Sequence, residues 1–388
     1  MNPQDGSGKA PIPFNQPHLV GNELQAIEQM LLAGKHSGDG PIMRSCQNWF
    51  VERLGSKASL MTPSCSLALD MAMLLCNLEP GDEVLIPDFT FVSTAQCIAM
   101  RGAVPVFCDI RPDTLNLDEA RLEEALTPKT KAIIPVHYAG VSAEMDFICA
   151  FAARNNLLVV EDAAQAIGAT YHGRPVGSLG DMAAFSFHET KNIHCGEGGM
   201  LAINNPKFVD PAYIAWEKGT DRRNFREGRV EKYQWKALGS SFLASEMAAA
   251  FLSVQLDAAH SINESRLAIW SRYQAALKPL GEMEKLGLPN VPENVFHNGH
   301  LFYLILPSSD ARSRFTAHMH ERAILTPFHY VALHQSDGGK TYGREGMKLR
   351  HSTDLSNRLV RLPLYANLSI EDQNRVIEAV FNFFGKNA

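Results

Sequence analysis

Lys191 has the sequence setting expected of a nucleophilic amine. It follows an apolar segment that ends at Phe187 and precedes the glycine-rich stretch 196–199, where backbone can approach a ligand closely. A lysine in a loop is usually solvated. A lysine that is partly desolvated beside a buried strand instead has a lowered pKa and can form a Schiff base. Lys191 is therefore a candidate for covalent catalysis.

Asp162 is a second candidate, because it directly follows the apolar run 157–160. An aspartate after a strand is often the N-cap of a helix. It can also pair with the pyridinium nitrogen of a cofactor, which keeps the ring protonated and makes it an electron sink. The residue alone leaves both roles open.

The segment Thr62-Pro63-Ser64-Cys65-Ser66 has the pattern of a strand end, a turn and a helix start at about Leu67. The free N–H groups in the first turn of such a helix can receive a phosphate, helped by the helix dipole. A serine at a helix N-cap is also common without any ligand. This segment is a candidate phosphate site.

These residues are positioned by alternating apolar and amphipathic segments. The strand candidates are 59–62, 83–87, 104–110, 132–137, 157–161, 183–187 and 200–203, and the crossover helices are 67–78, 92–100, 117–126 and 143–155. Continuous apolar strands alternating with helices predict an α/β fold with a mostly parallel, seven-stranded sheet. Ligands bind such sheets at the carboxyl ends of the strands, which here carry residues 89–91, 137–138, 161–162 and 188–191.

The pattern changes after Gly239, which predicts a second domain. A long helical segment covers about 244–277, just before Pro279, and a short strand signal follows at 301–306. We expect a large ligand-binding domain over residues 1–260 and a smaller α+β domain over residues 261–388.

Composition excludes several classes of protein. The 388 residues carry 36 Lys and Arg against 42 Asp and Glu, so there is no basic excess for nucleic-acid binding. No segment reaches the roughly 18 apolar residues of a membrane span. The 7 cysteines are scattered without a C-x-x-C pair, which is typical of a reducing compartment and predicts a cytoplasmic protein. His188 and His194 lack metal-ligand spacing, so no metal is predicted.

Several motifs together resemble the DegT/DnrJ/StrS family of nucleotide-sugar aminotransferases. They are Pro-Gly-Asp-Glu-Val (80–84), residues 87–91, residues 161–165, Ser-Phe-His (186–188), Lys191-Asn192 and the glycine-rich stretch 196–199. The similarity runs from about Pro13 to the C-terminus. It implies the fold type I architecture of aminotransferases that use pyridoxal 5'-phosphate, and a homodimer with active sites at the subunit interface.

The resemblance also implies roles for individual residues. Lys191 matches the Schiff-base lysine, Asp162 the partner of the ring nitrogen, and Gln165 the residue beside the pyridoxal hydroxyl group. Ser186 matches a phosphate-binding serine, and Phe91 an aromatic ring stacked on the cofactor. The backbone of Cys65, Ser66 and Leu67 corresponds to the phosphate loop, although Cys65 stands where most members have glycine.

A second departure concerns Ser241, which lies where many members have an asparagine that reaches the partner subunit's phosphate. Ser241 would then make that contact through a shorter side chain. His329 and Tyr330 lie in the segment that lines the sugar pocket in the family. The basic run 222–229, which ends in Arg229, is either a solvated loop or a site for the substrate pyrophosphate.

The implied reaction moves the amino group of L-glutamate to C4 of a nucleotide-linked keto sugar, with the galacto product favoured by the stretch 232–241. The gluco epimer or another nucleotide-linked keto sugar is the alternative. A keto-sugar dehydratase of the same fold would have histidine in place of Lys191. A regulator without turnover would not need the whole catalytic set, and a nicotinamide dehydrogenase would need a G-x-G-x-x-G motif that the first strands lack.

Overall fold

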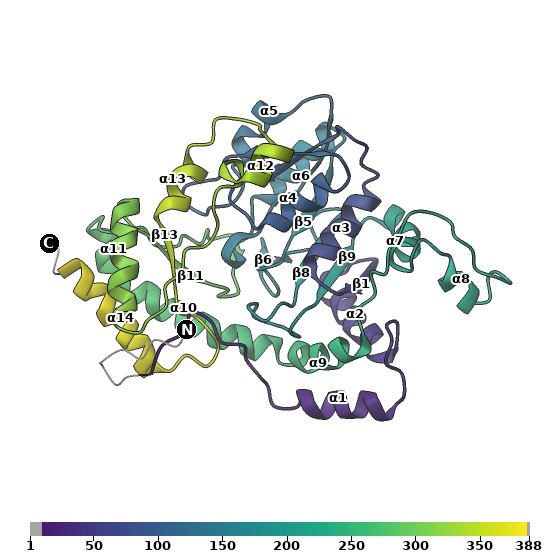
Figure 1. The fold of residues 1–388 in the computed structure, drawn as a ribbon, viewed down its shortest axis with the longest axis horizontal. Helices are drawn as coiled ribbons and strands as arrows, with labels where there is room; N and C mark the ends of the chain where they lie inside the picture. The colour runs from purple at the N-terminus through teal and green to yellow at the C-terminus, as the bar shows by residue number, and fades with distance from the viewer. Residues whose placement is uncertain (1–9, 386–388) are drawn as a thin grey trace.

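The fold is built on one large twisted sheet (Figure 1). In the computed structural model, which describes residues 10–385, this sheet has eight strands in the order β1-β9-β8-β5-β4-β2-β3-β12. Their bounds are β1 (Ala58–Thr62), β9 (Gly199–Ile203), β8 (Met182–Ser186), β5 (Leu158–Asp162), β4 (Thr130–Ile133), β2 (Glu83–Pro87), β3 (Val104–Cys108) and β12 (Arg344–Glu345). Strand β9 is antiparallel to both neighbours, and the other pairs are parallel.

The predicted α/β class is confirmed. Six of the seven predicted strands are present with ends shifted by at most two residues, and the predicted strand 132–137 is instead β4, which ends four residues earlier at Ile133. The eighth strand, β12, was not predicted. It has two residues and joins the sheet edge beside β3. Gly343 and Gly346 flank it, and a Cβ at either position would lie within 2.7 Å of Phe107 or Val106. Glycine therefore permits a close backbone approach that no apolar pattern signals.

Helices cover the sheet on both faces (Figure 1). The helices of this part are α1 (Glu23–Leu32), α2 (Pro41–Leu54), α3 (Cys65–Leu75), α4 (Val92–Ala99), α5 (Leu122–Ala125), α6 (Met145–Arg154), α7 (Val209–Trp216), α8 (Arg222–Arg226) and α9 (Glu246–Asp257). The predicted helix 117–126 is shorter than expected, because a 3₁₀ turn, Glu119–Arg121, precedes α5. A small sheet joins β6 (Thr170–Tyr171), β7 (Arg174–Pro175) and β10 (Val295–Phe296).

The predicted helix 244–277 is wrong at its middle and its end. It consists of α9 and α10 (Ala259–Glu282), which are separated at Ala258. Helix α10 continues through Pro279 instead of ending before it. Pro279 lies in the last turn, where its missing N–H removes one helical hydrogen bond shortly before the helix ends at Glu282.

The C-terminal part has its own apolar core. Strands β11 (Phe302–Ile305) and β13 (Leu359–Leu362) pair antiparallel, next to α11 (Ser309–His320), α12 (Asp337–Tyr342), α13 (His351–Arg358) and α14 (Ile370–Gly385). Tyr273 of α10 packs in this core with Phe302 and Phe315. The predicted boundary at residue 260 lies in the first turn of α10, and β12 crosses back to the large sheet. The division into 1–260 and 261–388 therefore stays a prediction.

Within residues 10–385, none of the helices is long and apolar enough to cross a lipid bilayer.

Candidate active site

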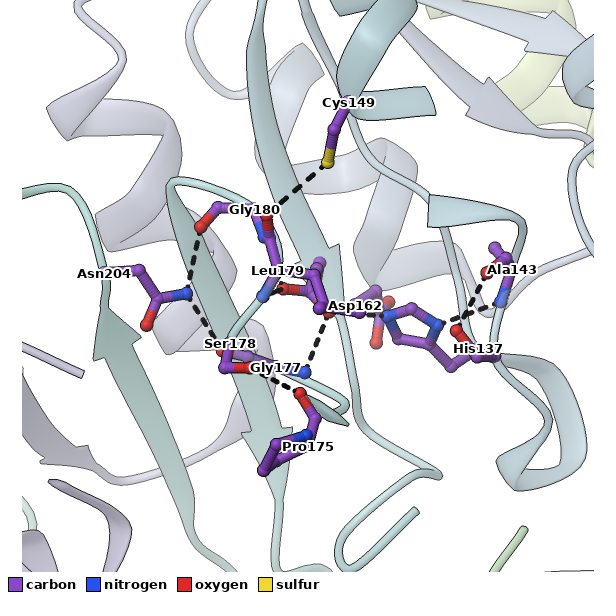
Figure 2. Close-up of polar contacts among 12 residues, drawn as sticks. His137, Ala143, Cys149, Asp162, Pro175, Gly177, Ser178, Leu179, Gly180 and Asn204 are labelled. Atoms are coloured by element: carbon purple, nitrogen blue, oxygen red, sulfur yellow. Dashed lines mark hydrogen bonds and ion pairs between the residues drawn. The ribbon is translucent and has the colours of Figure 1, made fainter. Parts of the chain in front are cut away.

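Strand β5 ends in two carboxylates that have different surroundings. The side chain of Glu161 is completely buried and accepts hydrogen bonds from the N–H groups of Gly177 (2.8 Å), Leu179 (2.7 Å) and Gly180 (2.7 Å). His137 Nε2 lies 3.0 Å from the same carboxylate, and Figure 2 shows how these groups surround the end of the strand. All of its hydrogen-bonding capacity is used inside the protein, so Glu161 is structural.

Asp162 lies on the opposite face of β5, since successive strand residues point in opposite directions. It is 5% exposed, and it accepts hydrogen bonds from Thr94 Oγ1 (2.8 Å) and from the N–H of Ala164 (3.2 Å). Burial raises the pKa of Asp162, and the hydrogen bonds and the charge of Lys191 only partly oppose this. A buried carboxylate with a raised pKa is stabilised when a cation is placed beside it.

Lys191 lies in the loop between β8 and β9, where it is half-buried. Its N–H donates to the carbonyl of His188 at 2.9 Å, which fixes the turn that carries it. Burial lowers the pKa of Lys191, while the carboxylate of Asp162 acts in the opposite direction. A lowered pKa increases the fraction of neutral amine, which is the nucleophilic form.

The predicted phosphate loop forms the start of α3. Ser64 is the N-cap, and its hydroxyl accepts from the N–H of Leu67 at 3.2 Å. The hydroxyl groups of Ser66 and Ser93 lie 2.6 Å apart. Cys65 is helical and has a negative φ, so this turn does not need the glycine of other family members. Gly199 packs under the loop, because a Cβ there would lie 2.5 Å from the backbone nitrogen of Cys65.

These groups surround one cavity of about 530 Å³. Its walls include most of the residues predicted for the site: Cys65, Ser66, Phe91, Asp162, Gln165, Ser186, Lys191, His329 and Tyr330. The C-terminal part supplies the last two, which stack with ring centroids 3.6 Å apart. Tyr330 accepts a hydrogen bond from Gln165 Nε2 at 2.8 Å, and His329 Nδ1 lies 2.8 Å from the hydroxyl group of Tyr138. The two parts of the chain therefore build the cavity together.

Three predicted residues lie outside this cavity. Leu67 does not line the cavity, and its backbone N–H donates to the hydroxyl group of Ser64, the N-cap of α3. Ser241 is exposed and lines a separate hollow of about 320 Å³ with Arg222 and Arg226. Arg229 forms an ion pair with Glu227 at 3.0 Å and is 64% exposed. In a single chain, the predicted roles of Ser241 and Arg229 have no structural support.

Three other residues of the site were missed by the sequence analysis. Thr94 binds Asp162, Ser93 binds Ser66, and Arg361 of β13 lines the cavity beside Lys191. The two α4 residues follow Phe91 by two and three positions, in the first turn of the helix that begins after it, and could have been found from that position. Arg361 comes from a strand far along the chain, and no local pattern connects it to the site.

A cavity that combines a buried carboxylate, a perturbed lysine and a helix N-terminus at a sheet's carboxyl edge defines a class of enzyme, the aminotransferases of fold type I. Residues 17–381 match the family described as the DegT/DnrJ/EryC1/StrS aminotransferase family. The chain belongs to this family.

Relatives agree with this assignment. The spore coat polysaccharide biosynthesis protein SpsC of Bacillus subtilis is 34% identical over 377 residues, which cover 95% of this chain and 96% of the relative. The aminotransferase TlmJ from Streptoalloteichus hindustanus superposes with a TM-score of 0.88 at 30% identity, over 97% of this chain and 99% of its own. NtdA from Bacillus subtilis, solved with bound cofactor PMP, has a TM-score of 0.87 at 27% identity, over 98% and 87%.

Aminotransferases of this family use pyridoxal phosphate, and structures similar to this chain are known in PLP and PMP forms. The residues of the cavity fit this cofactor. Asp162 is a buried carboxylate with no cationic partner within hydrogen-bond distance among residues 10–385, as a partner of the ring nitrogen requires. The first N–H groups of α3 face the same cavity as Lys191, which suits a phosphate at one end and a carbonyl carbon at the other.

Proposed function

We propose that the enzyme transfers the amino group of L-glutamate to a nucleotide-linked keto sugar, with Lys191 carrying pyridoxal phosphate. The observation that carries the proposal is the pairing of Lys191 and buried Asp162 in one large cavity. When bound, the cofactor supplies an electron sink for the negative charge that develops at the reacting carbon. The residues around it have to bind, orient and move protons.

Each side chain has one task in this proposal. Lys191 Nζ would act as the base that moves the proton at the carbon bearing the amine. Asp162 holds the ring nitrogen in its protonated form, and Thr94 keeps the carboxylate in place. The loop 64–66 and Ser186, which line the cavity, would hold the phosphate, Phe91 would pack against the ring, and Gln165 would lie beside the ring hydroxyl group.

We assign the acceptor as dTDP-4-dehydro-6-deoxy-D-glucose, aminated at C4 to dTDP-4-amino-4,6-dideoxy-D-galactose with release of 2-oxoglutarate. Support comes from the stretches 186–192, 217–220 and 232–241, which resemble the transaminase of enterobacterial common antigen biosynthesis. The relative SpsC is named for polysaccharide biosynthesis. His329 and Tyr330, at the cavity wall, are the proposed sugar contacts. The gluco epimer, or another nucleotide-linked keto sugar, is the alternative product of the same chemistry.

The proposal includes a cytoplasmic homodimer whose subunits complete each other's active sites. Its support is an arm, residues 219–241, which contains α8 and projects from one edge of the molecule (Figure 1). Residues 231–241 are all exposed, including Trp235 at 77% and Leu238 at 68%. Large exposed apolar side chains of this kind are typical of an interaction surface. Ser241 at the end of the arm could then reach the partner's phosphate.

The experiment is a panel of dTDP- and UDP-linked keto sugars incubated with L-glutamate and holoenzyme, with products identified by mass spectrometry. We expect conversion of the dTDP-4-keto-6-deoxy sugar and none with Lys191→Ala. In the NMR spectrum of the product, a small H3–H4 coupling indicates axial nitrogen and the galacto product. A large diaxial coupling would establish the gluco epimer, and no aminated sugar at all would refute the proposal.

A further inference from the structure

The 3₁₀ turn that follows β4 contacts both residues that the C-terminal part supplies to the cavity. Tyr138 Oη lies 2.8 Å from His329 Nδ1. The N–H of Ala139 donates to Gln165 Oε1 at 2.7 Å, and Gln165 Nε2 donates in turn to Tyr330 Oη at 2.8 Å. The rings of His329 and Tyr330 stack on each other. The turn therefore holds this wall of the cavity at two points.

The backbone of the turn has an unusual conformation. Ala139 has a φ of 58°, in the left-handed region, and Gly140 has a φ of 81°. A Cβ at Gly140 would overlap Oδ1 of Asn298, so glycine is required there. A left-handed alanine is strained and persists only where the surrounding contacts hold it. Such a contact precedes it, because the N–H of Tyr138 donates to Asn116 Oδ1 at 2.9 Å.

The hydrogen bond between Tyr138 and His329 has one favoured direction. Tyr138 is 1% exposed, and its hydroxyl group has no other hydrogen-bond partner among residues 10–385. If the imidazole donated, the phenol proton would be buried without an acceptor, which is costly. Burial raises the pKa of Tyr138, so the phenol keeps its proton at physiological pH. Tyr138 is therefore the donor, and His329 Nδ1 is the acceptor.

This direction determines which nitrogen of His329 carries hydrogen. Burial lowers the pKa of His329 well below its ordinary value, and the charges of Arg361 and Lys191 lower it further, so the ring is neutral. A neutral imidazole whose Nδ1 accepts has its proton on Nε2. Within the described part of the chain, Nε2 of His329 has no hydrogen-bond partner, and it is accessible. Since His329 lines the main cavity, this N–H is a donor that a ligand can use.

We infer that Tyr138 is a positioning residue, which fixes His329 as a neutral Nε2–H donor to an oxygen of the keto sugar. This inference rests on the proposed function, in which His329 is a sugar contact. Hydroxyl and carbonyl oxygens of a sugar are acceptors that a neutral N–H group can bind. A donor held in one direction also selects among sugars, because a sugar without an oxygen at that place leaves the donor unpaired.

Nitrogen-15 NMR of holoenzyme labelled in the histidine rings reads the tautomer directly. Ring nitrogens with and without hydrogen resonate in different ranges, and the signals of His329 are those lost in His329→Gln. We expect hydrogen on Nε2 alone in the wild type, and a detectable Nδ1–H form in Tyr138→Phe. Hydrogen on Nδ1 in the wild type, or an unchanged His329 spectrum in Tyr138→Phe, would overturn the inference.

Single-turnover absorbance measurements test the consequence for the reaction. Holoenzyme is converted by L-glutamate and then mixed with the dTDP-linked keto sugar, and the rates of the two half-reactions are compared. Tyr138→Phe should slow the keto-sugar half-reaction about three- to tenfold relative to the glutamate half-reaction, the range of one lost hydrogen bond. The matched control is Tyr273→Phe, which removes a buried hydroxyl group that donates to the carbonyl of Pro363 at 3.0 Å in the C-terminal core. This control should leave the ratio of the two rates unchanged.

Substitutions of His329 separate control of the tautomer from a purely structural effect. Glutamine places its amide nitrogen near the position of Nε2 and has no tautomers, whereas asparagine places its amide nitrogen near Nδ1. His329→Gln should therefore retain more of the keto-sugar rate than His329→Asn. Adding Tyr138→Phe to His329→Gln should change that rate by less than about twofold. An equal loss from Tyr138→Phe with histidine and with glutamine at this position would show that the tyrosine only packs, and the inference would be wrong.

Failure of the proposed function would be visible separately. If the wild-type enzyme does not aminate the keto sugar, the proposed acceptor is wrong, and the NMR spectra still decide the tautomer. If Tyr138→Phe slows both half-reactions equally, the assignment of the His329 donor to the sugar is refuted.

Discussion

Replacing Glu161 by Gln should destabilise the fold strongly without changing the chemistry. The Glu161 carboxylate accepts hydrogen bonds from three backbone N–H groups and faces His137 Nε2 at 3.0 Å. His137 Nδ1 accepts the N–H of Ala143 at 3.1 Å, which assigns the ring proton to Nε2. All four partners are therefore donors, and a carboxylate is an acceptor at both oxygens.

The size of the stability loss follows from the number of buried donors that glutamine leaves without an acceptor. One oxygen of Glu161 serves Leu179 and Gly180, and the other serves Gly177 and His137. Glutamine keeps one oxygen and places an NH₂ group against the other pair. Two buried donors lose their acceptor at about 1–3 kcal/mol each, so the free energy of unfolding should fall by about 2–6 kcal/mol. That is a large share of the stability of a typical domain, about 5–15 kcal/mol.

Urea unfolding of the cofactor-free protein, followed by circular dichroism, measures this loss. Glu282→Gln is the control, because it removes the same charge from a side chain that is 65% exposed and paired only with Lys278. The control should change the free energy of unfolding by less than about 1 kcal/mol. Folded Glu161→Gln enzyme should keep kcat within about threefold, since its side chain points away from the cavity. A loss of stability no larger than that of the control would refute the hydrogen-bond account.

Further predictions concern the cavity itself. Borohydride reduction of holoenzyme should leave a pyridoxyl group on the peptide containing Lys191, and Lys191→Ala should have no transaminase activity in a coupled glutamate assay; an adduct on another lysine would refute the assignment. Asp162→Asn should still bind the cofactor but lose about 10²–10³ in kcat, because an amide cannot hold the ring proton; near-normal kcat would show that Asp162 is only a cap. Because burial raises the pKa of Asp162 above 3.8, its carboxyl group stabilises the cofactor-free fold most below that value and loses this contribution as the pH rises through the raised pKa. Cofactor-free Asp162→Asn should therefore match or exceed the wild type in stability at about pH 7, as urea unfolding across pH would measure; a clear loss there would contradict the cause of the shift. Competitive acetylation of cofactor-free enzyme should titrate Lys191 at a lower pH than exposed lysines, as the direction of its shifted pKa requires, and equal midpoints would contradict the desolvation.

Local sequence patterns predicted the framework of the site. The apolar runs of β5 and β8 are buried along their length, and such runs read as strands buried on both faces. The rule that ligands bind at the carboxyl edge then placed Asp162, Lys191 and Phe91 at one cavity. The resemblance to the family added individual roles, which spacing alone could not provide.

What could not be predicted depends on contacts between distant segments. Arg361 reaches the cavity because β13 pairs with β11, and no pattern near residue 361 indicates this pairing. The break at Ala258 between α9 and α10 has no glycine or proline to signal it. The sequence singled out Asp162, but nothing near residue 161 indicated that the turn 177–180 binds the neighbouring Glu161.

The charges around the cavity suggest how one site can serve two different substrates. Asp162 offers negative charge at one wall, while Lys191 and Arg361 offer positive charge at another. A protonated ring nitrogen would pair with the carboxylate of Asp162 in both half-reactions. This pairing would keep the cofactor bound while the two substrates exchange. In the proposed function, L-glutamate would bring its carboxylates to the site, while the nucleotide-linked keto sugar would bring its charge in the pyrophosphate. The proposed sugar contacts are His329 and Tyr330, which line the cavity wall that the C-terminal part supplies. We therefore expect His329→Ala to impair the half-reaction with the keto sugar more than the half-reaction with L-glutamate, as single-turnover absorbance measurements of each half-reaction would show.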